Sequence, residues 1–486
     1  MDGLKVLEII RKTNPWFKTN EVPNAQLEQF RRREFYPLKK ELAHPDMATL
    51  IIGARRVGKS VLMYQLVDEL LESGVEGKRV LFIQGDNPIL TEYAATGSLI
   101  NFILDLYQKY IIEEPFDELS KTIYIFIDEA QSLKMWDTEI KAIIDQKYRI
   151  KFVVTGSSSF ELRRGSQNPL TGRVNIQPIF PFSFVDYANY SIKDIAFGDQ
   201  TNKLGNKFRE SLMSGNPEAT YAVAKEAKSL IGSHKLETYF ETYLFRGGFP
   251  RVIAYPGNDY HRYLRDLLTT TISKDIMTQV EIRDTQSFER LMVNLCLLAG
   301  QAIKYKNLAD ILGIDERSVI KYIDYYVESH WVFLSSPYMF HNRPDSVRTD
   351  KKVYIIDSGV INTLSFKDID DFRSDKTHRG HILENVIHNH LLAYKQSDVG
   401  TFQSSIPFWI ETETDKEIDF ILEIRGGVLP IEVKLKVTYD ENDESAIRDF
   451  LSKRQSAKFG ILTTKDTLML KENILLIPSV LFTLLL

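Results

Sequence analysis

A glycine-rich loop with the chemistry of a phosphate-binding site lies near the start of the chain. Residues 53–60 read Gly-Ala-Arg-Arg-Val-Gly-Lys-Ser, the full Gly-x-x-x-x-Gly-Lys-Ser pattern. The glycines let backbone N–H groups turn toward phosphate oxygens, and the N-terminus of a following helix adds partial positive charge. In this pattern Lys59 reaches the β- and γ-phosphates, and the Ser60 hydroxyl ligates Mg²⁺. The expected nucleotide contacts are Gly53, Ala54, Arg55, Arg56, Val57, Gly58, Lys59, Ser60 and Val61.

The residues on either side of this loop have the patterns that the motif requires. Residues 48–52 are mostly apolar and β-branched, which predicts a strand, and residues 61–71 have helical spacing. A strand, a glycine loop and a helix in this order distinguish a functional loop from a chance glycine turn. We therefore predict that the chain binds a nucleoside triphosphate.

A second predicted strand ends in two acidic residues. Residues 121–127 are mostly apolar and lead into Asp128 and Glu129, and a further strand is expected at 79–84, between the loop and the acids. Asp128 would hold Mg²⁺ directly or through water, and Glu129 would polarise the attacking water as a general base. A strand that ends in two acids by chance is the alternative. Beside a complete phosphate loop, the pair predicts ATP hydrolysis.

The motifs GARRVGKS, IFIDEAQSL, VVTGSSSFEL, LTGR and PFSF occur in this order, and the series resembles the prokaryotic AAA+-like ATPases common in archaea. The glutamate after the aspartate and the extra strand at 79–84 also resemble the additional-strand, catalytic-glutamate division of P-loop ATPases. The resemblance runs from about residue 35 to the C-terminus, with Ala54 where proline is common. It implies an α/β fold: a P-loop NTPase parallel sheet with a helical lid, then a winged helix, then an α/β restriction-endonuclease-like domain.

Two further catalytic groups are expected from this resemblance. A polar residue after the strand near 150–155 senses the γ-phosphate in such ATPases; Ser157 is the first choice, with Thr155 and Ser158 as alternatives. A serine-rich helix cap explains any one of these serines equally well. Arg173 is a candidate arginine finger for the chain's own nucleotide or for that of a neighbour in a homo-oligomer. A structural salt bridge is the alternative for Arg173.

Residues 244–250 read Leu-Phe-Arg-Gly-Gly-Phe-Pro, a run typical of the same family. The resemblance implies that this run opens the lid, with Arg246 or Arg251 as the sensor 2 arginine. From the residues alone, Gly-Gly-Phe-Pro predicts a tight turn.

A helix-turn-helix pattern lies in the middle of the chain. Residues 305–312 predict a short helix, Gly313 a turn, and residues 315–327 a capped second helix, after which residues 331–334 would begin a wing. Between residues 301 and 345 five basic side chains stand against six acidic ones, so the segment lacks a basic footprint. DNA binding and a structural or protein-contact role both remain open.

Four residues near the C-terminus resemble the metal site of PD-(D/E)xK nucleases. Glu384 lies on a predicted amphipathic helix, Asp419 in one strand, and Glu432 and Lys434 in another, where the two-residue period puts them on one face. The carboxylates would bind a divalent ion, Mg²⁺ or Mn²⁺, and Lys434 would stabilise charge at the attacked phosphate. An exposed strand with alternating charge also produces Glu-x-Lys, and a nuclease-like fold without activity is the alternative.

Composition limits the class of protein. The 61 basic and 66 acidic side chains of the 486 residues give a net charge of −5, so no global positive field favours nucleic acid. The single cysteine, Cys296, is expected to be a core thiol in a reducing cytoplasm. No signal peptide is apparent, and the apolar residues 474–486 are too few to span a bilayer, so no membrane partner is expected. We expect His388 and His390 to be helix-face residues, and residues 474–486 to be a buried strand and helix.

Together these features predict an ATP-hydrolysing, AAA+-like chain with ATP and Mg²⁺ as ligands. Its nucleotide state would control the engagement or cleavage of nucleic acid, with DNA as the expected partner, through the nuclease-like domain. The alternative is a switch ATPase that acts on protein partners and keeps an inactive nuclease-like scaffold. The expected parts are an N-terminal extension, an ATPase core, a helical lid, a winged helix and a nuclease-like domain, at 1–34, 35–190, 191–285, 286–345 and 346–486.

Overall fold

The chain divides into two compact units in the computed structural model, Met1–Ile179 and Phe180–Leu486. The first unit contains the phosphate loop, and the second contains every element from residue 180 onward. The structure describes residues 3–94, 98–156, 170, 172–230, 234–253, 257, 259–277, 280–338, 350–398, 405–411, 416–436 and 441–486.

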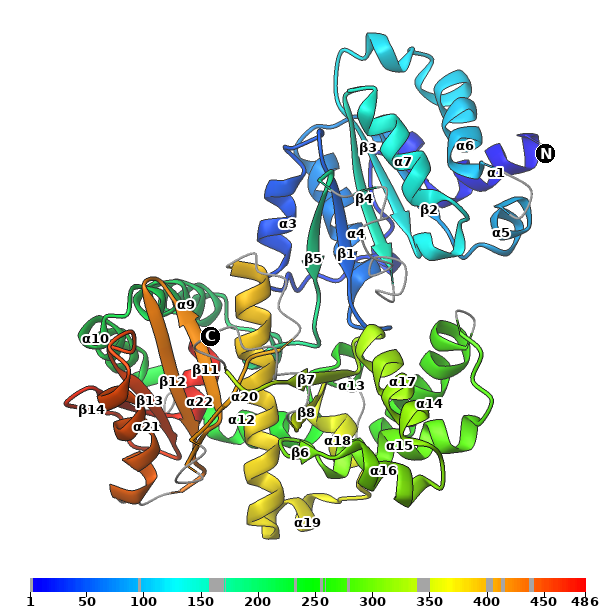
Figure 1. Ribbon diagram of the computed structural model, residues 1–486. Helices are drawn as coiled ribbons and strands as arrows, with labels where there is room; N and C mark the ends of the chain where they lie inside the picture. Colours follow the sequence, from blue (N-terminus) through cyan, green and yellow to red (C-terminus); the bar gives the residue numbers. More distant parts are fainter. Residues whose placement is uncertain are drawn as a thin grey trace. The chain divides into compact units, whose positions relative to one another are not determined.

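The first unit is built on a five-stranded sheet in the order β2-β3-β4-β1-β5, in which every pairing is parallel (Figure 1). β4 lies between β1 and β3 and is therefore the additional strand of the sheet. The strand at residues 79–84, which was predicted to be this extra strand, is β2; that assignment is wrong, because β2 forms the edge beyond β3. The strand bounds are β1 (Ala48–Ile52), β2 (Val80–Gln84), β3 (Ile123–Asp128), β4 (Ile150–Gly156) and β5 (Val174–Pro178).

Helices cover both faces of this sheet. Residues of α1, α6 and α7 join alternate strand residues such as Ile125 and Phe152 in one core. On the other face, Tyr64 of α4 stacks on Phe82 with ring centroids 4.6 Å apart, and Phe82 stacks on Phe126. Burial of both faces explains why the strands are almost continuously apolar. The helices are α1 (Gly3–Thr13), α2 (Trp16–Thr19), α3 (Phe35–Glu41), α4 (Lys59–Glu72), α5 (Pro88–Ala94), α6 (Leu99–Tyr107) and α7 (Trp136–Asp145).

The segment after α1 covers the outer edge of β2. The buried Asn14 side chain accepts a hydrogen bond from the Phe82 N–H at 2.6 Å and donates to the Phe82 carbonyl at 2.9 Å. Trp16 Nε1 donates to the Val80 carbonyl at 2.7 Å. These side chains replace the neighbouring strand that an edge strand lacks, which satisfies backbone groups that would otherwise remain unpaired.

A helical module with a small sheet lies within the second unit. Its antiparallel sheet has the order β6-β8-β7. Gly313 ends α16 with φ 71°, and Asp315 caps α17 by accepting from Ser318 N at 3.0 Å, so the predicted helix pair is confirmed. Residues 351–355 were predicted to belong to the next domain. They form β8 instead, which pairs with β6 and β7 on its two sides within this sheet. The elements are α15 (Thr285–Leu297), β6 (Ala302–Ile303), α16 (Tyr305–Leu312), α17 (Glu316–Glu328), β7 (Val332–Ser335) and β8 (Lys351–Ile355).

A second five-stranded sheet, of mixed direction, follows in the order β11-β12-β13-β15-β14. Its three central strands are parallel, and β11 and β14 are antiparallel to their neighbours at the edges. The long helix α20 packs against both β8 and β12. The elements are α18 (Ser358–Leu364), α19 (Ile369–Ser374), α20 (Lys376–Asp398), β9 (Trp409–Ile410), β10 (Glu417–Ile418), β11 (Phe420–Ile424), β12 (Gly427–Val433), α21 (Glu441–Lys453), β13 (Gly460–Thr464), β14 (Met469–Lys471), β15 (Ile474–Pro478) and α22 (Ser479–Leu485).

The helices between residues 184 and 271 belong to the core of the second unit. α9 and α10 pack against α22, while α12 and α14 pack against α18. A lid function for residues 191–285, which requires contact with the nucleotide, stays a prediction. The helices are α8 (Phe184–Ile192), α9 (Ile195–Ser214), α10 (Pro217–Ala227), α12 (Leu236–Arg246), α13 (Pro250–Ile253) and α14 (Asp259–Thr271).

Three smaller expectations concern buried residues and membrane-spanning segments. β15 and α22 are buried, which confirms a terminal strand and helix at residues 474–486. Cys296 is a buried core thiol, and burial raises its pKa well above the usual range. Within the described ranges, none of the helices has the length and apolar character needed to cross a membrane.

Replacing Asn14 by Ala should lower the free energy of unfolding by about 3 kcal/mol, because it leaves the buried Phe82 N–H and carbonyl without partners. Chemical denaturation followed by circular dichroism measures this change. Asn101→Ala is the matched control, since the Asn101 side chain is exposed and donates to Ser98 Oγ, and its loss should cost at most about 0.5 kcal/mol. Equal effects of the two substitutions would contradict the role of Asn14.

Candidate functional site

The carboxyl ends of β1, β3 and β4 meet at one edge of the parallel sheet, and the predicted nucleotide residues follow them directly. Gly53 adopts φ 154°, and a Cβ there would lie 2.2 Å from the Ile179 carbonyl oxygen, so only glycine fits this turn. Gly58 (φ 106°) precedes α4, and Arg56 also has a positive φ of 64°. The loop is therefore a tight turn that leads into the N-terminus of α4, as an anion-binding loop requires.

Lys59 is buried inside the loop. Its Nζ donates to the carbonyls of Gly53 at 2.9 Å and of Ala54 at 3.1 Å. These bonds hold the ammonium within the turn, where the phosphates of a nucleotide would also lie. The position agrees with the predicted role of Lys59 as the phosphate-binding cation.

Arg32, which was not among the predicted site residues, also supports the loop. The guanidinium is 4% exposed, forms a two-point pair with Glu34 at 2.7 and 3.0 Å, and donates from Nη1 to the Val57 carbonyl at 2.9 Å. The contact turns one loop carbonyl toward Arg32 and away from the phosphate side. Residues 31–33 are all arginine, so no signal in the sequence singles out the middle one.

Asp128, Glu129 and Thr155 form a connected group. Asp128 is on the same strand face as Phe126, because strand side chains alternate, and this face is covered by α4. Thr155 Oγ1 donates to Asp128 Oδ1 at 2.5 Å and accepts from the Glu129 backbone N–H at 2.9 Å. One hydroxyl therefore fixes both the carboxylate of Asp128 and the backbone of Glu129.

The pair formed by Asp128 and Ser60 fits a magnesium ion. Burial raises the pKa of Asp128, and hydrogen bonds from Thr155 and Ser60 to its carboxylate oppose this rise. A hydroxyl and a carboxylate side by side are the hard oxygen donors that Mg²⁺ prefers. A buried carboxylate whose charged form is disfavoured would also gain from a nearby cation.

Glu129 lies directly beyond β3 with a positive φ of 52°. Its carboxylate accepts from Gln131 Nε2 at 2.5 Å, so the side chain is oriented by a neighbour rather than by the sheet. Of the three candidates for γ-phosphate sensing, Ser157 and Ser158 lie outside the described residues. Thr155, the alternative within them, is the one that contacts the acidic pair.

Arg173 does not lie near the phosphate loop of its own unit. Its carbonyl accepts from Ala48 N at 2.9 Å, at the amino end of β1, whereas the loop follows the carboxyl end of that strand. Its Nε donates to Asp145 Oδ1 at 2.5 Å in an exposed ion pair. The prediction of a finger on the chain's own nucleotide is therefore wrong, because the parallel register puts Arg173 at the opposite edge. Action on a neighbour's nucleotide stays a prediction.

The run at residues 244–250 is a buried turn in the second unit. Gly247 adopts φ 79°, and Gly248 N donates to Asp357 Oδ2 at 2.6 Å. The Arg246 guanidinium stacks on the Tyr260 ring at 4.7 Å and donates to the Val252 carbonyl at 3.3 Å. Arg251 lies over a tyrosine ring at 5.9 Å. These contacts have a packing role, and a sensor 2 function for either arginine stays a prediction.

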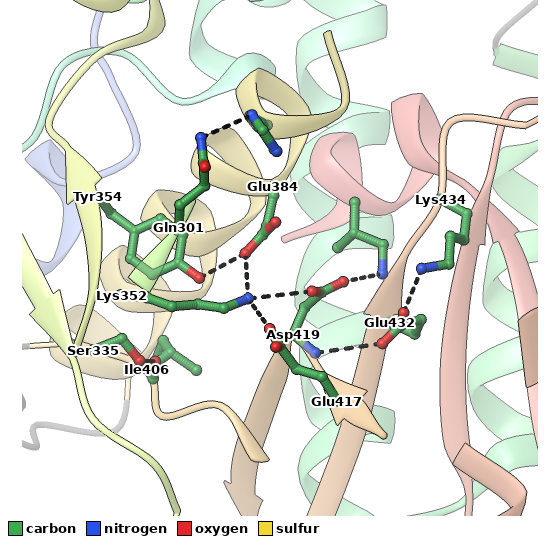
Figure 2. A network of polar contacts seen from close by, with 12 residues as sticks. Gln301, Ser335, Lys352, Tyr354, Glu384, Ile406, Glu417, Asp419, Glu432 and Lys434 are labelled. Atoms are coloured by element: carbon green, nitrogen blue, oxygen red, sulfur yellow. Dashed lines mark hydrogen bonds and ion pairs between the residues drawn. The ribbon is translucent and has the colours of Figure 1, made fainter. Parts of the chain in front are cut away.

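The four residues of the predicted nuclease-like site come together around one network (Figure 2). Asp419 Oδ2 accepts from Val433 N at 2.8 Å, and Asp419 N donates to Glu432 Oε2 at 3.4 Å. Lys434 Nζ donates to Glu432 Oε1 at 2.6 Å, as the shared strand face predicts. Glu384 approaches the group from α20. We refer to Glu384, Asp419, Glu432 and Lys434 with their direct partners as the acidic centre.

Two partners in the acidic centre were not predicted, and both come from β8. Lys352 Nζ lies 3.0 Å from Glu384 Oε1 and 3.5 Å from Asp419 Oδ1, and it also contacts Glu417. The Tyr354 hydroxyl donates to the same Glu384 oxygen at 2.8 Å. No spacing rule connects β8 with a helix and strands that follow it by 30 residues or more, so the sequence offered no signal.

Burial and mutual repulsion shape the charges of this centre. Burial, and then the charge of Asp419, raise the pKa of Glu384 to about 7 and that of Glu432 to about 8, against the opposing effect of the lysines. Burial disfavours the charged form of Lys352, but the surrounding carboxylates outweigh it and raise the pKa above its ordinary value. Across the described part of the chain, no group of three or more His, Cys, Asp or Glu side chains is arranged to hold a metal ion.

The two histidines of α20 are buried core residues. His388 stacks on Tyr354 with ring centroids 3.9 Å apart, and burial lowers its pKa to about 3. His390 Nε2 accepts from Phe184 N at 2.8 Å.

The helix-turn-helix segment lacks a basic surface. The exposed positions of α17 carry two acidic and two basic side chains and one isoleucine: Glu316, Arg317, Ile320, Lys321 and Asp324. The charges balance on the helix that would enter a DNA groove, which gives no electrostatic attraction to phosphate.

Comparison with known proteins identifies the first part of the chain. Residues 45–188 match a family described as an AAA domain. Two families described as domains of unknown function match residues 237–371 (DUF8612) and 379–482 (DUF4143). The chain therefore contains an AAA-type P-loop ATPase domain that binds a nucleotide, and its five-stranded parallel sheet is that of a P-loop NTPase.

Relatives of similar length exist in a bacterium and an archaeon. An uncharacterized protein of Haemophilus influenzae is 22% identical over 83% of this chain and 87% of that protein. The uncharacterized protein MJ1544 of Methanocaldococcus jannaschii is 21% identical over 85% and 79%. The Walker-type ATPase PABY2304 of Pyrococcus abyssi, a solved structure, is 16% identical and covers 69% of this chain and 95% of its own, with a TM-score of 0.37. A score of this size does not establish a shared overall arrangement.

Replacing Thr155 by Val should lower kcat for ATP hydrolysis by about 10–100-fold, because the isosteric side chain cannot orient Asp128 or Glu129. Thr155→Ser keeps the hydroxyl and should retain most of the activity. Steady-state phosphate release and nucleotide titration measure kcat and affinity separately. Wild-type turnover by Thr155→Val would show that this hydroxyl has no positioning role.

Proposed function

We propose that this chain hydrolyses ATP, with Glu129 as the general base and with Ser60 and Asp128 as the residues that hold Mg²⁺. The observation that carries the proposal is the Thr155 hydroxyl, which joins Asp128 to the backbone of Glu129 at the edge of the sheet where the phosphate loop lies. Two acidic residues with a purely structural role would not need one buried hydroxyl to hold both of them at this edge of the sheet.

Each residue has a separate task in this mechanism. The backbone N–H groups of the loop and Lys59 bind the phosphates, and Arg32 keeps the loop in its turned form. Glu129 takes a proton from the attacking water as the bond to the γ-phosphorus forms and the bond to the leaving oxygen breaks. The bound ion would neutralise charge on the phosphate oxygens.

We assign the second unit a winged helix and a nuclease-like fold as part of the proposal. Support for the first is the order of α15, β6, α16, α17, β7 and β8 with its three-stranded sheet. Support for the second is the order of α20, the antiparallel pair β11 and β12, and α21 leading to the parallel strand β13. The four motif residues lie on or directly beside these elements, and their order along the chain resembles that of PD-(D/E)xK nucleases.

The nucleotide state is proposed to act on a protein partner through this second unit. The balanced charge of α17 favours protein contact over nucleic-acid contact. Control of nucleic-acid engagement or cleavage is the second candidate, favoured by the meeting of Glu384, Asp419, Glu432 and Lys434 in one centre.

Glu129→Gln should retain ATP binding but lower kcat by about 10²–10⁴-fold, because the amide cannot accept the proton of the attacking water. Lys59→Ala should instead weaken ATP binding by about 10–100-fold, since it removes a charged hydrogen-bond donor. Isothermal titration and single-turnover phosphate release separate these effects. Wild-type hydrolysis by Glu129→Gln would exclude the proposed base.

Single-stranded DNA, duplex DNA and RNA should each change the ATP turnover of the wild-type chain by less than about twofold, because α17 offers no net positive charge to phosphate. Turnover is measured with each nucleic acid at low salt, and cleavage is assayed in parallel with Mg²⁺ and Mn²⁺. Stimulated turnover, or cleavage that is lost in both Asp419→Ala and Lys434→Ala, would favour the second candidate instead.

A further inference from the structure

Lys352 occupies the middle of the acidic centre. The side chain is 6% exposed, and its Nζ contacts three carboxylates from two segments: Glu384 of α20, and Glu417 and Asp419 beside the start of β11. Figure 2 shows the ammonium between Glu384 and the two acids near the start of β11. The ammonium also lies over the Phe408 ring, with Nζ 5.5 Å from its centroid.

The backbone of Lys352 leaves the side chain little freedom to withdraw. β8 is the central strand of its sheet, where Lys352 is in register with Ala302 on one side and with Ser335 on the other. Both neighbours hold the backbone of the strand, and the contact with Glu384 shows that the side chain projects toward α20. A buried ammonium also cannot reach water without breaking its ion pairs.

The residues of the acidic centre do not fit a divalent ion while Lys352 is in place. A metal ligand must approach Mg²⁺ or Mn²⁺ to about 2.0–2.2 Å, and the ammonium lies where an ion shared by Glu384 and Asp419 would lie. The other donor atoms are also engaged: Asp419 Oδ2 by Val433 N, and both Glu432 oxygens by Asp419 N and Lys434. The oxygens of Asp419 and Glu432, and Oε1 of Glu384, therefore already have protein partners.

We propose that Lys352 is the resident cation of the acidic centre and takes the place that a divalent ion has in PD-(D/E)xK nucleases. The native centre then binds no divalent ion, and its charge is balanced by a side chain that belongs to a different sheet. The inference rests on the proposed nuclease-like fold of the C-terminal elements and not on the proposed ATPase mechanism.

The lysine also joins two parts of the second unit. β8 carries Lys352 and belongs to the three-stranded sheet, whereas Glu432 lies in β12 of the C-terminal sheet and Asp419 directly precedes β11 of that sheet. A metal ion could be released, but a lysine cannot leave the chain. Lys352 thus links the two sheets permanently, whereas a metal ion in the same place could exchange with solvent.

Divalent-ion binding to the full chain tests this proposal. The nucleotide site is first disabled by Ser60→Ala with Asp128→Asn, and Mn²⁺ binding is then measured by electron paramagnetic resonance without nucleotide. We expect no stoichiometric Mn²⁺ in this background chain and about one ion when Lys352→Ala is added. Adding Asp419→Asn to the Lys352→Ala chain should abolish that ion.

Stability measurements keep the test decisive if Lys352→Ala folds poorly. The substitution should lower the melting temperature by about 5 °C or more, and Mn²⁺ should recover part of this loss only in the Lys352→Ala chain. Lys352→Arg keeps the positive charge and should show neither the ion nor the recovery.

Two results would overturn the proposal. One is Mn²⁺ bound by the background chain and lost with Asp419→Asn, because Lys352 would then not exclude the ion. The other is a folded Lys352→Ala chain that takes no Mn²⁺. ATP turnover of the chain with an intact nucleotide site is measured separately, so failure of the ATPase proposal is distinguishable from failure of this one.

Discussion

The parallel direction of five strands is the constraint on which the first unit depends. Because β1, β3 and β4 run the same way, their carboxyl ends reach one edge, and the phosphate loop, the acidic pair and Thr155 meet there. The insertion of β4 between the other two brings its hydroxyl within reach of Asp128. An antiparallel neighbour would have placed that side chain at the far edge, where Arg173 lies.

The nucleotide site was largely readable from the sequence because its parts are local. The loop, the strand before it and the helix after it are contiguous in the sequence. Asp128 and Glu129 directly follow an apolar run, which is recognisable as a buried strand. Thr155 was only an alternative to Ser157, since several polar residues follow one another there. Arg173 shows the complementary limit: the residue was recognised, but only strand pairing reveals at which edge it lies.

Contacts between distant elements could not be predicted in this way. Lys352 meets Glu384 and Asp419 through the pairing of β8 with β6 and β7 and the packing of α20, neither of which follows from periodicity. The predicted domain boundary at residue 346 also groups β8 with the domain that follows it. The boundary and the lysine were therefore missed for one reason, because sheet membership is a property of the folded chain.

The outer edge of β2 has a practical meaning for where this chain can be cut. The match to the AAA domain begins at residue 45, yet Asn14 and Trp16 supply the hydrogen bonds that close the sheet, and Arg32 supports the loop. A fragment that starts at residue 45 would present an unpaired, apolar strand as a template for intermolecular pairing. The residues before the recognisable domain thus cover the edge strand β2 and protect the chain from aggregation.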